Sequence, residues 1–222
     1  MRTPSVCSDS ALPDSLHQLL RTRTHAAHER LNQHPLLEGL TQPGYPLRSY
    51  WLVLSACYHF YCAMESLIES ASEQSKTGFD YVPRRKLGWL HQDLIDSFHI
   101  DPEDAFWRPT REFQPIRIED QADLVGALYV IEGATLGGQV ISRHIQAGQL
   151  GVSAEHGGRF FHGYGEQTAS RWNEFLSVAE QACPDAAQRE KAARAALAVF
   201  AEAEAVLNDY SARAGRNLRP RT

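Results

Sequence analysis

The sequence predicts an all-α protein, and three observations lead to this fold class. Apolar residues recur at helical spacing along most of the chain. No segment shows the sustained apolar/polar alternation and β-branched enrichment that are typical of strands. Prolines concentrate in a few short segments, which leaves long stretches free to be helical. We therefore expect one compact domain of six to eight helices without internal repeats.

The expected helices follow from these patterns in chain order. Ser15 is a good N-cap for a helix that begins at Leu16 and is ended or kinked at Pro35. A turn-forming cluster over 41–46 precedes a long helix that is apolar around much of its girth, as in the interior of a bundle. In all, helices are expected over residues 16–34, 47–71, 84–98, 119–149, 166–181 and 186–211.

The remaining segments are expected to be loops and tails. The connection over 101–115 holds three prolines, and the segment over 151–165 is rich in glycine. Residues 1–14 and 213–222 lack a helical pattern and are expected to be flexible tails. Residues 15–212 would then form the domain.

The composition excludes several classes of protein. Of the 222 residues, 43% are hydrophobic and 22% are charged, as in an ordinary globular protein. The net charge of -5 argues against nucleic-acid binding, which usually needs a basic surface. The longest apolar run spans residues 124–131 and the N-terminus lacks a signal-peptide core, so we expect no membrane segment and a cytoplasmic location. The four cysteines are too few and too scattered for a disulfide framework.

The most unusual segment is the predicted helix over 123–145, which contains four glycines. Each interior glycine costs roughly 1 kcal/mol relative to alanine, so this helix is soft and easily bent. Gly133 and Gly137 are four residues apart and share one face, where another object can approach the backbone closely. Periodicity alone favours close helix packing as the explanation. A flat ligand that lies on the helix is the alternative.

A second unusual segment, residues 20–32, carries two histidines on a half-apolar helix. Arg21 and His28 stand on one face, whereas His25 is turned away by about 100°. A single histidine in such a position is usually structural. His28 differs because the side-chain oxygen of Asn32 can accept a hydrogen bond from its Nδ1–H and leave Nε2 free for a metal. Arg21 suits a carboxylate on a ligand bound there.

Together, these two segments resemble the heme oxygenase family. Thr24-x-x-x-His28 resembles the family's proximal helix, whose histidine binds the heme iron. The run GATLGGQ over 133–139 resembles its distal helix, where glycines bring the backbone over the heme, and residues 55–69 resemble the helix between them. The longer run IEGATLGGQVI is most similar to bacterial members that supply biliverdin to bacteriophytochromes. The resemblance covers roughly residues 15–210.

The resemblance implies a single-domain, multi-helical bundle with heme between the proximal and distal helices. It implies that His28 is the axial iron ligand and that Arg21 and Arg171 contact the heme propionates. It also implies that Tyr61 helps to order water on the distal side. The further heme-lining residues that it implies are Gly133, Gly137 and Gly138, of which Gly133 and Gly137 count with Tyr61 as catalytic.

Two positions depart from the family's pattern. Many members have an aspartate just after the first distal glycine, where this chain has Ala134. Many have a glutamate four residues after the ligand histidine, where this chain has Asn32, a neutral partner that should donate less electron density to the iron. The first departure leaves Thr135, Tyr61 or Glu132 to hold the distal water.

The activity implied by the resemblance is cleavage of heme by O₂ to biliverdin, iron and carbon monoxide, with heme as both substrate and cofactor. Electrons are expected from an external donor, a ferredoxin-type protein or ascorbate, because the sequence has no flavin or nicotinamide motif. Apo-bacteriophytochrome is an expected recipient of the product.

Two other functions compete with this one. A heme or tetrapyrrole carrier without turnover is favoured by Ala134 and Asn32. A non-heme helical protein, such as a thiamin-degrading relative or an interaction module, is disfavoured by the combination of His28 with the glycine-rich helix.

Overall fold

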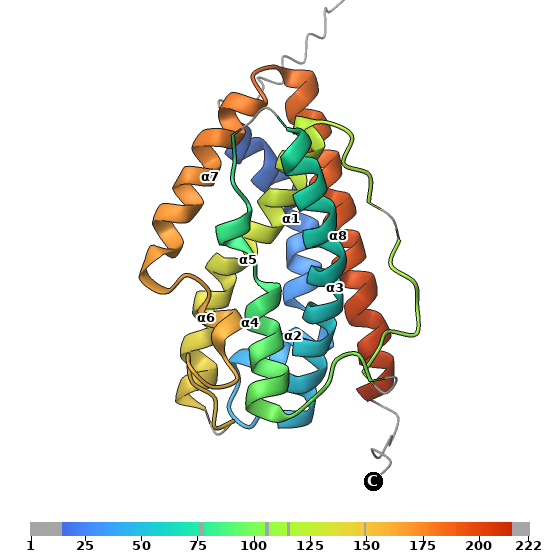
Figure 1. Ribbon diagram of the computed structural model, residues 1–222, viewed down its shortest axis with the longest axis vertical. Coiled ribbons are helices and arrows are strands. Elements are labelled where there is room, and N and C mark those ends of the chain that lie inside the picture. The colour runs from blue at the N-terminus through green and yellow to red at the C-terminus, as the bar shows by residue number, and fades with distance from the viewer. Residues whose placement is uncertain (1–14, 76–77, 105–106, 115, 149, 215–222) are drawn as a thin grey trace, which may run out of the picture.

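The computed structural model describes residues 15–75, 78–104, 107–114, 116–148 and 150–214, and these form the all-α fold that the sequence predicts (Figure 1). They contain no strand, and one isolated β-bridge joins Ser153 to Gly157. The α-helices are α1 (Leu16–Asn32), α2 (Pro35–Glu38), α3 (Leu47–Gln74), α4 (Leu87–His91), α5 (Gln121–Ala147), α6 (Arg159–His162), α7 (Thr168–Ala182) and α8 (Ala186–Ala214). Shorter helical turns are η1 (Gly39–Thr41), η2 (Val82–Arg84), the π-helical η3 (Gln92–Ser97) and η4 (Gly165–Gln167).

Most helix boundaries agree with the sequence pattern. The Ser15 side chain accepts a hydrogen bond from the backbone N–H of Gln18 at 3.2 Å and so caps α1 as expected. Helix α3 continues to Gln74, three residues beyond the expected end. The expected tail residues 1–14 and 215–222 lie outside the described residues, whereas α8 continues to Ala214.

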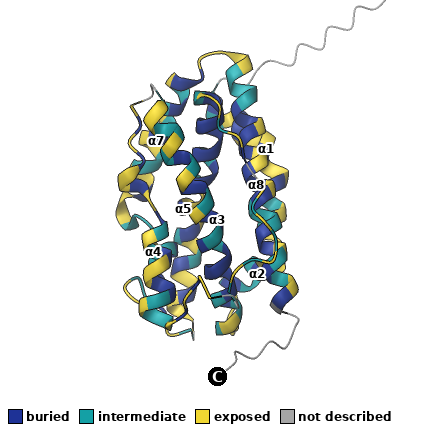
Figure 2. Cartoon of the chain, turned by 45° about the vertical axis from the view of Figure 1, so that its right-hand side comes forward, coloured by how far each residue is buried: buried dark blue, intermediate teal, exposed yellow. Residues whose placement is uncertain are grey.

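The bundle is arranged around α8, α5 and α3. Helix α8 packs against α5, α1 and α3, while α6 and α7 pack against α5 (Figure 1). Figure 2 shows α3 and α5 as largely buried helices in the middle of the molecule. Apolar residues from these helices and from α8 form the core. This burial is what the apolar girth of the two long helices requires.

Helices α3 and α5 are also long and apolar enough to cross a membrane by length and composition alone. In each of them, 56% of the most apolar 18-residue window is buried inside the protein. Their apolarity is therefore accounted for by the core of the bundle.

Helices α1 and α8 run in the same direction. Arg23 of α1 pairs with Glu190 near the start of α8 at 2.5 Å, and Arg30 pairs with Glu204 further along at 3.2 Å. Because both residue numbers rise together, the two helices are parallel. These surface pairs contribute little stability but establish the direction.

Helix α5 starts beside the start of α8 and runs parallel to it. Its N-cap, Asp120, accepts a hydrogen bond from Lys191 at 2.7 Å. Further along, a Cβ atom added to Gly126 would lie 2.2 Å from the carbonyl oxygen of Ala192. At this glycine, close helix packing is therefore the explanation that the structure supports.

The region expected as one helix over 84–98 is divided into η2, α4 and η3. Glu65 of α3 helps to divide it, because its carboxylate accepts hydrogen bonds from the backbone N–H of Lys86 at 2.5 Å and from the Tyr81 hydroxyl at 3.1 Å. These bonds fix the chain just before α4 begins. The long-range contact that breaks the helix is invisible to a periodicity argument.

Helix α6 lies within the segment expected as a glycine-rich loop. Asp93 of η3 holds its first turn by accepting hydrogen bonds from the backbone N–H groups of Arg159 at 3.0 Å and Phe160 at 2.9 Å. Burial raises the pKa of Asp93 to about 6, against the opposing effect of these bonds. The contact places α6 against the C-terminal half of α5.

The packing at Gly126 gives a stability prediction. Gly126→Ala should lower the free energy of unfolding by about 1–3 kcal/mol, because the new methyl group forces α5 and α8 apart. Gly137→Ala on the same helix is the matched control, since no heavy atom lies within 4 Å of its added Cβ. Urea denaturation of both variants checks this, and equal stability of the two would contradict the packing argument.

Candidate active site

His28 stands on the exposed side of α1. Its side chain is 57% exposed, and the edge of its ring faces Phe200 of α8 at a centroid distance of 6.2 Å. Thr24, one turn earlier, is buried and donates its hydroxyl hydrogen bond to the carbonyl oxygen of Leu20 at 2.8 Å. The structure therefore leaves the His28 imidazole on the outer face of the helix while Thr24 faces the core. An open imidazole of this kind can bind a metal ion.

The neighbours of the His28 Nδ1 atom differ from the expectation. The amide nitrogen of Asn32, and not its oxygen, lies 3.2 Å from Nδ1. The same amide donates to the Glu29 carboxylate at 3.4 Å, and that carboxylate lies 3.6 Å from Nδ1. The position four residues after His28 is neutral, as the sequence says, but a carboxylate from the next residue stands beside the ring. Sequence reasoning missed Glu29 because it considered only the i+4 partner.

The outer face of α5 carries an apolar strip with little side-chain cover at its glycines. It consists of Gly133, Leu136, Gly137 and Val140 and is called the bare strip below. Leu136 is 38% exposed and Val140 is 49% exposed. A Cβ atom added to Gly137 would meet no heavy atom within 4 Å, whereas one added to Gly133 would lie 3.7 Å from the Trp172 ring. The two glycines expected to share a face therefore border open space and a flat aromatic ring. A planar apolar ligand can approach the α5 backbone there.

Gly138 has a different position from the one expected. A Cβ atom added to Gly138 would lie 3.0 Å from the carbonyl oxygen of Phe161 in α6, and the residue is buried. Its neighbour Gly137 is exposed, because consecutive residues on a helix differ in direction by about 100°. In this structure Gly138 allows α6 to pack closely on α5 and does not extend the bare strip.

An aromatic cluster joins α1, α5 and α7 at one end of this strip. The ring of His17 lies 6.4 Å from that of Tyr129 and 5.7 Å from that of Trp172, and the last two rings are 5.7 Å apart. Arg21 follows His17 by one turn and is exposed. Arg21 and Trp172 thus lie at the edge of the strip that contains Gly133.

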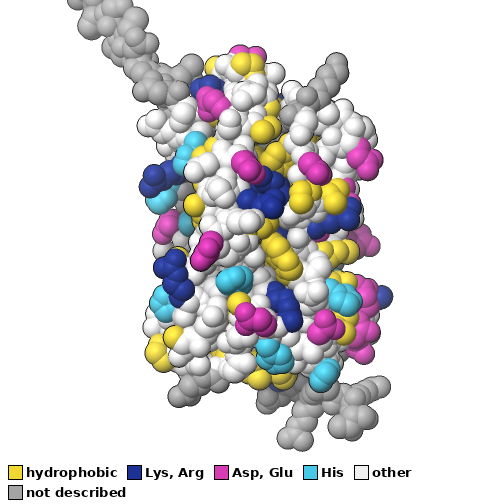
Figure 3. Space-filling model, turned by 60° about the vertical axis from the view of Figure 1, so that its left-hand side comes forward, with side chains coloured by type: hydrophobic (Ala, Val, Ile, Leu, Met, Phe, Trp, Pro, Cys, Tyr) yellow, Lys and Arg dark blue, Asp and Glu magenta, His cyan; other side chains and the backbone are white. Residues whose placement is uncertain are grey.

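His28 and Gly137 lie at similar distances from this aromatic cluster, measured along the axes of α1 and α5. From residue 17 to 28, α1 advances by roughly 16 Å, and from residue 129 to 137, α5 advances by roughly 12 Å. Both helices run parallel to α8 and pack on it. The exposed imidazole and the bare backbone strip therefore stand on two helices that both pack on α8. Figure 3 shows the side of the molecule on which α6 and α7 lie, with hydrophobic side chains along its middle between charged ones.

Behind the strip, the carboxylate of Glu132 is the centre of a buried ionic cluster. It accepts hydrogen bonds from Arg84 at 2.7 Å, from Lys86 at 2.7 Å and from the Tyr164 hydroxyl at 3.0 Å. Arg84, Lys86 and Glu132 are each at most 4% exposed. Burial lowers the pKa of Lys86, and the charge of Glu132 opposes this effect. Both oxygens of Glu132 are therefore occupied, which leaves it poorly suited to hold distal water.

Of the residues expected to hold that water, Tyr61 has the most available hydroxyl. It is 3% exposed, and its ring meets the edge of Phe160 at 5.2 Å. No hydrogen bond to its hydroxyl is found within the described part of the chain. Burial raises the pKa of Tyr61 well above its usual range, so it stays a neutral donor. In contrast, the Thr135 hydroxyl donates to the carbonyl oxygen of Glu132 at 2.6 Å.

Arg171 is half-buried at the start of α7. Its guanidinium lies over the Tyr164 ring, 5.1 Å from the ring centroid, and its carbonyl oxygen accepts a hydrogen bond from Arg84 at 3.0 Å. Because Trp172 follows it directly, Arg171 lies near the edge of the strip. The structure thus brings Arg171 close to the expected site through residues that sequence reasoning did not connect.

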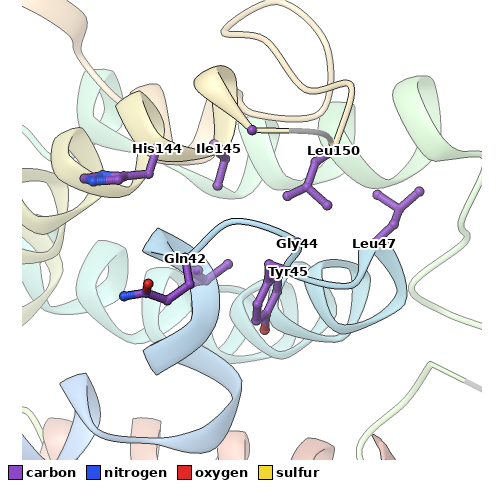
Figure 4. Close-up of a pocket in the computed structure, with 9 residues that line it drawn as sticks. Gln42, Gly44, Tyr45, Leu47, His144, Ile145 and Leu150 are labelled. Carbon is purple, nitrogen blue, oxygen red and sulfur yellow. The ribbon is translucent and has the colours of Figure 1, made fainter.

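A separate pocket of about 190 Å³ lies at the opposite end of α5 (Figure 4). It is lined by Gln42 and Tyr45 on one side and by His144 and Ile145 of α5 on the other. None of the expected site residues belongs to its lining.

Comparison with known proteins decides the family. A family model described as heme oxygenase matches residues 14–209 of the chain. The chain belongs to the heme oxygenase family. A heme oxygenase from Xanthomonas campestris pv. campestris is 33% identical over 114 residues, which cover 51% of this chain and 67% of that protein.

Solved heme oxygenase structures have the same fold as this member of the family. The NO- and CO-bound heme oxygenase from Neisseria meningitidis superposes with a TM-score of 0.73 at 21% identity, over 89% of this chain and 92% of that one. The Leptospira interrogans heme oxygenase gives 0.70 at 16% identity, over 87% and 98%. Heme oxygenase-1 from Synechocystis in complex with heme gives 0.64 at 19% identity, over 90% and 93%. The expected fold is confirmed, and the chain is an oxidoreductase of the heme oxygenase type.

The buried cluster behind the strip gives a second stability prediction for this heme oxygenase. Glu132→Gln should lower the free energy of unfolding by about 3–5 kcal/mol, because it leaves the buried Lys86 ammonium without a carboxylate partner and the buried Arg84 with only Glu174. Glu69→Gln, which removes the carboxylate from an exposed pair with Arg85, is the matched control and should change stability little. Urea denaturation measures both, and a small loss for Glu132→Gln would show that the cluster does not hold the fold.

Proposed function

We propose that this chain cleaves heme to biliverdin, iron and carbon monoxide, using O₂ and electrons from an external donor. Family membership and fold support heme degradation. The observation that carries the finer proposal is the exposed His28 imidazole on α1 at the depth of the bare Gly137 backbone on α5. A flat macrocycle with a central metal fits between one open nitrogen donor and one strip without side chains. The residues present therefore fit heme.

Each expected residue has one task in this proposal. His28 binds the iron through Nε2, with Glu29 beside Nδ1 to orient the ring. Gly133 and Gly137 keep side chains away from the macrocycle, and Tyr61 donates a hydrogen bond to water on that side. When bound, heme supplies the iron chemistry that activates O₂.

Charge at the edge of the site suits the two propionates. Arg21 on α1 and Arg171 on α7 each present a guanidinium, which binds carboxylates in a bidentate manner. A ferredoxin-type protein or a small reductant such as ascorbate would deliver electrons, since the sequence has no motif for a flavin or nicotinamide. We place this reaction in the cytoplasm.

A heme or tetrapyrrole carrier without turnover is the second candidate. It is supported by Ala134, which stands where many family members have an aspartate. It is also supported by the ion pairs of Glu132, which keep that carboxylate from holding distal water. Tyr61 is then the main remaining donor. The carrier would bind hemin and leave it intact.

Replacing His28 tests the proposed site. Mixing the protein with hemin, ascorbate and catalase in air should bleach the Soret band and raise biliverdin absorbance, and His28→Ala should abolish this turnover because the iron loses its protein ligand. His25→Ala, on the same helix but another face, is the matched control and should retain turnover. A Soret band that forms and persists in the unmodified protein would favour the carrier, and the absence of any Soret band would refute the heme site.

We further propose that the product serves as a bacteriophytochrome chromophore. The support is the similarity of IEGATLGGQVI to members with that role. Purified apo-bacteriophytochrome added to the turnover mixture should acquire the absorbance of its holoprotein. If it takes up added biliverdin but nothing from the reaction, the chromophore role is wrong.

A further inference from the structure

The ring of Tyr164 is held at several points beside the proposed site. Its hydroxyl donates to Glu132 at 3.0 Å and accepts from Lys86 at 3.0 Å. Trp89 packs against it edge-on, with ring centroids 5.4 Å apart. The flanking residues Gly163 and Gly165 have φ values of 58° and 56°, which favour glycine and turn the loop so that the ring enters the bundle. Tyr164 is therefore a rigid platform.

Arg171 stacks on the Tyr164 ring and forms no ion pair with a carboxylate of the described residues. Its guanidinium lies 5.1 Å from the Tyr164 ring centroid, and the described residues supply no acidic partner for it. Nearby Arg84, by contrast, pairs with both Glu132 and Glu174. A half-buried, oriented cation that lacks an anionic partner is suited to an anionic ligand.

The position of Arg171 suits a carboxylate of the proposed ligand. The next residue, Trp172, lies against Gly133 at the edge of the bare strip. Arg21 presents a second exposed cation from α1 near the same end. Two cations at one edge of a flat site match a planar macrocycle that carries two carboxylates on one side.

We infer that Tyr164 is a positioning residue that holds Arg171 for one heme carboxylate, and that this contact selects the rotation of the macrocycle and therefore the meso carbon that is cleaved. The inference rests on the proposed function. Stacking on the ring restricts the guanidinium to few orientations, so the contact costs less side-chain entropy than a free arginine would require. Tyr164 acts through Arg171 and needs no contact with heme.

Two substitutions at position 164 separate the ring from the hydroxyl. Tyr164→Phe and Tyr164→Leu both remove the hydrogen bonds to the Glu132 cluster, but only the leucine variant also removes the stacking surface. Tyr164→Phe should keep the biliverdin isomer ratio of the unmodified protein. Tyr164→Leu should shift that ratio in the same direction as Arg171→Gln and weaken hemin binding by about tenfold. The double variant Tyr164→Leu/Arg171→Gln should equal Arg171→Gln alone.

The measurements are chromatography of the biliverdin isomers and hemin titration followed at the Soret band. Arg117→Gln, at an arginine whose side chain is 86% exposed, controls for loss of positive charge. Hemin dimethyl ester, which lacks free carboxylates, should bind equally well to the unmodified protein and to Arg171→Gln. Additive effects in the double variant, or an unshifted isomer ratio in Tyr164→Leu, would overturn the positioning role. Unchanged hemin binding and isomer ratio in Arg171→Gln would overturn the carboxylate contact.

The binding measurements need no turnover. If the protein binds hemin without cleaving it, the proposed function fails, while the difference between hemin and its dimethyl ester still tests Arg171 and Tyr164. Proton NMR of the bound hemin then replaces the isomer ratio as the readout of macrocycle rotation, and an unchanged rotation in Tyr164→Leu would overturn the inference.

Discussion

The buried carboxylate of Glu132 is the interaction on which the arrangement of the site depends. It lies one residue before Gly133, where the glycine-rich part of α5 begins, and it binds Arg84 and Lys86 from the segment that precedes α4. Through Arg84 and Tyr164, the same cluster reaches α7 and the loop after α6. Such a cluster contributes little net stability compared with an apolar core, because its groups lose hydration. Its value lies in fixing three segments relative to one another at a single place.

The Glu132 cluster helps to hold the backbone of the glycine-rich helix α5 in a defined position. Glycines make α5 soft, yet a site that holds a flat ligand needs a defined backbone. Gly126 packs on α8 and Gly138 packs on α6, and these close contacts restrict the backbone conformation at both glycines. Gly137 alone of these three borders open space. Close packing therefore explains Gly126 and Gly138, whereas the flat ligand is the proposal for the open face at Gly137.

The sequence predicted those features that depend on local periodicity. The cap of α1 at Ser15 and the apolar interior helices follow from local pattern. The exposure of His28 does not, because Thr24, one turn earlier on the same helix, is buried. The cluster around Glu132 was beyond such reasoning, because Lys86 and Arg84 lie 46 and 48 positions away in the sequence, in a segment that was expected to be one continuous helix. The contact of Gly138 with α6 and the direction of the Asn32 amide were not predicted for a related reason, because both depend on neighbours that a single helix does not specify.

The distribution of charge around α5 explains how a site with few acids can suit its ligand. The glutamate nearest the bare strip is neutralised by two buried cations, and the position after Gly133 carries only a methyl group. The strip itself is therefore close to neutral, while Arg21 and Arg171 place positive charge at its edge. The proposed ligand, a macrocycle with an apolar body and two carboxylates on one side, would meet complementary surroundings there. Burial raises the pKa of Tyr61 and keeps its hydroxyl neutral, so in the proposed site this one weak acid would serve the distal side.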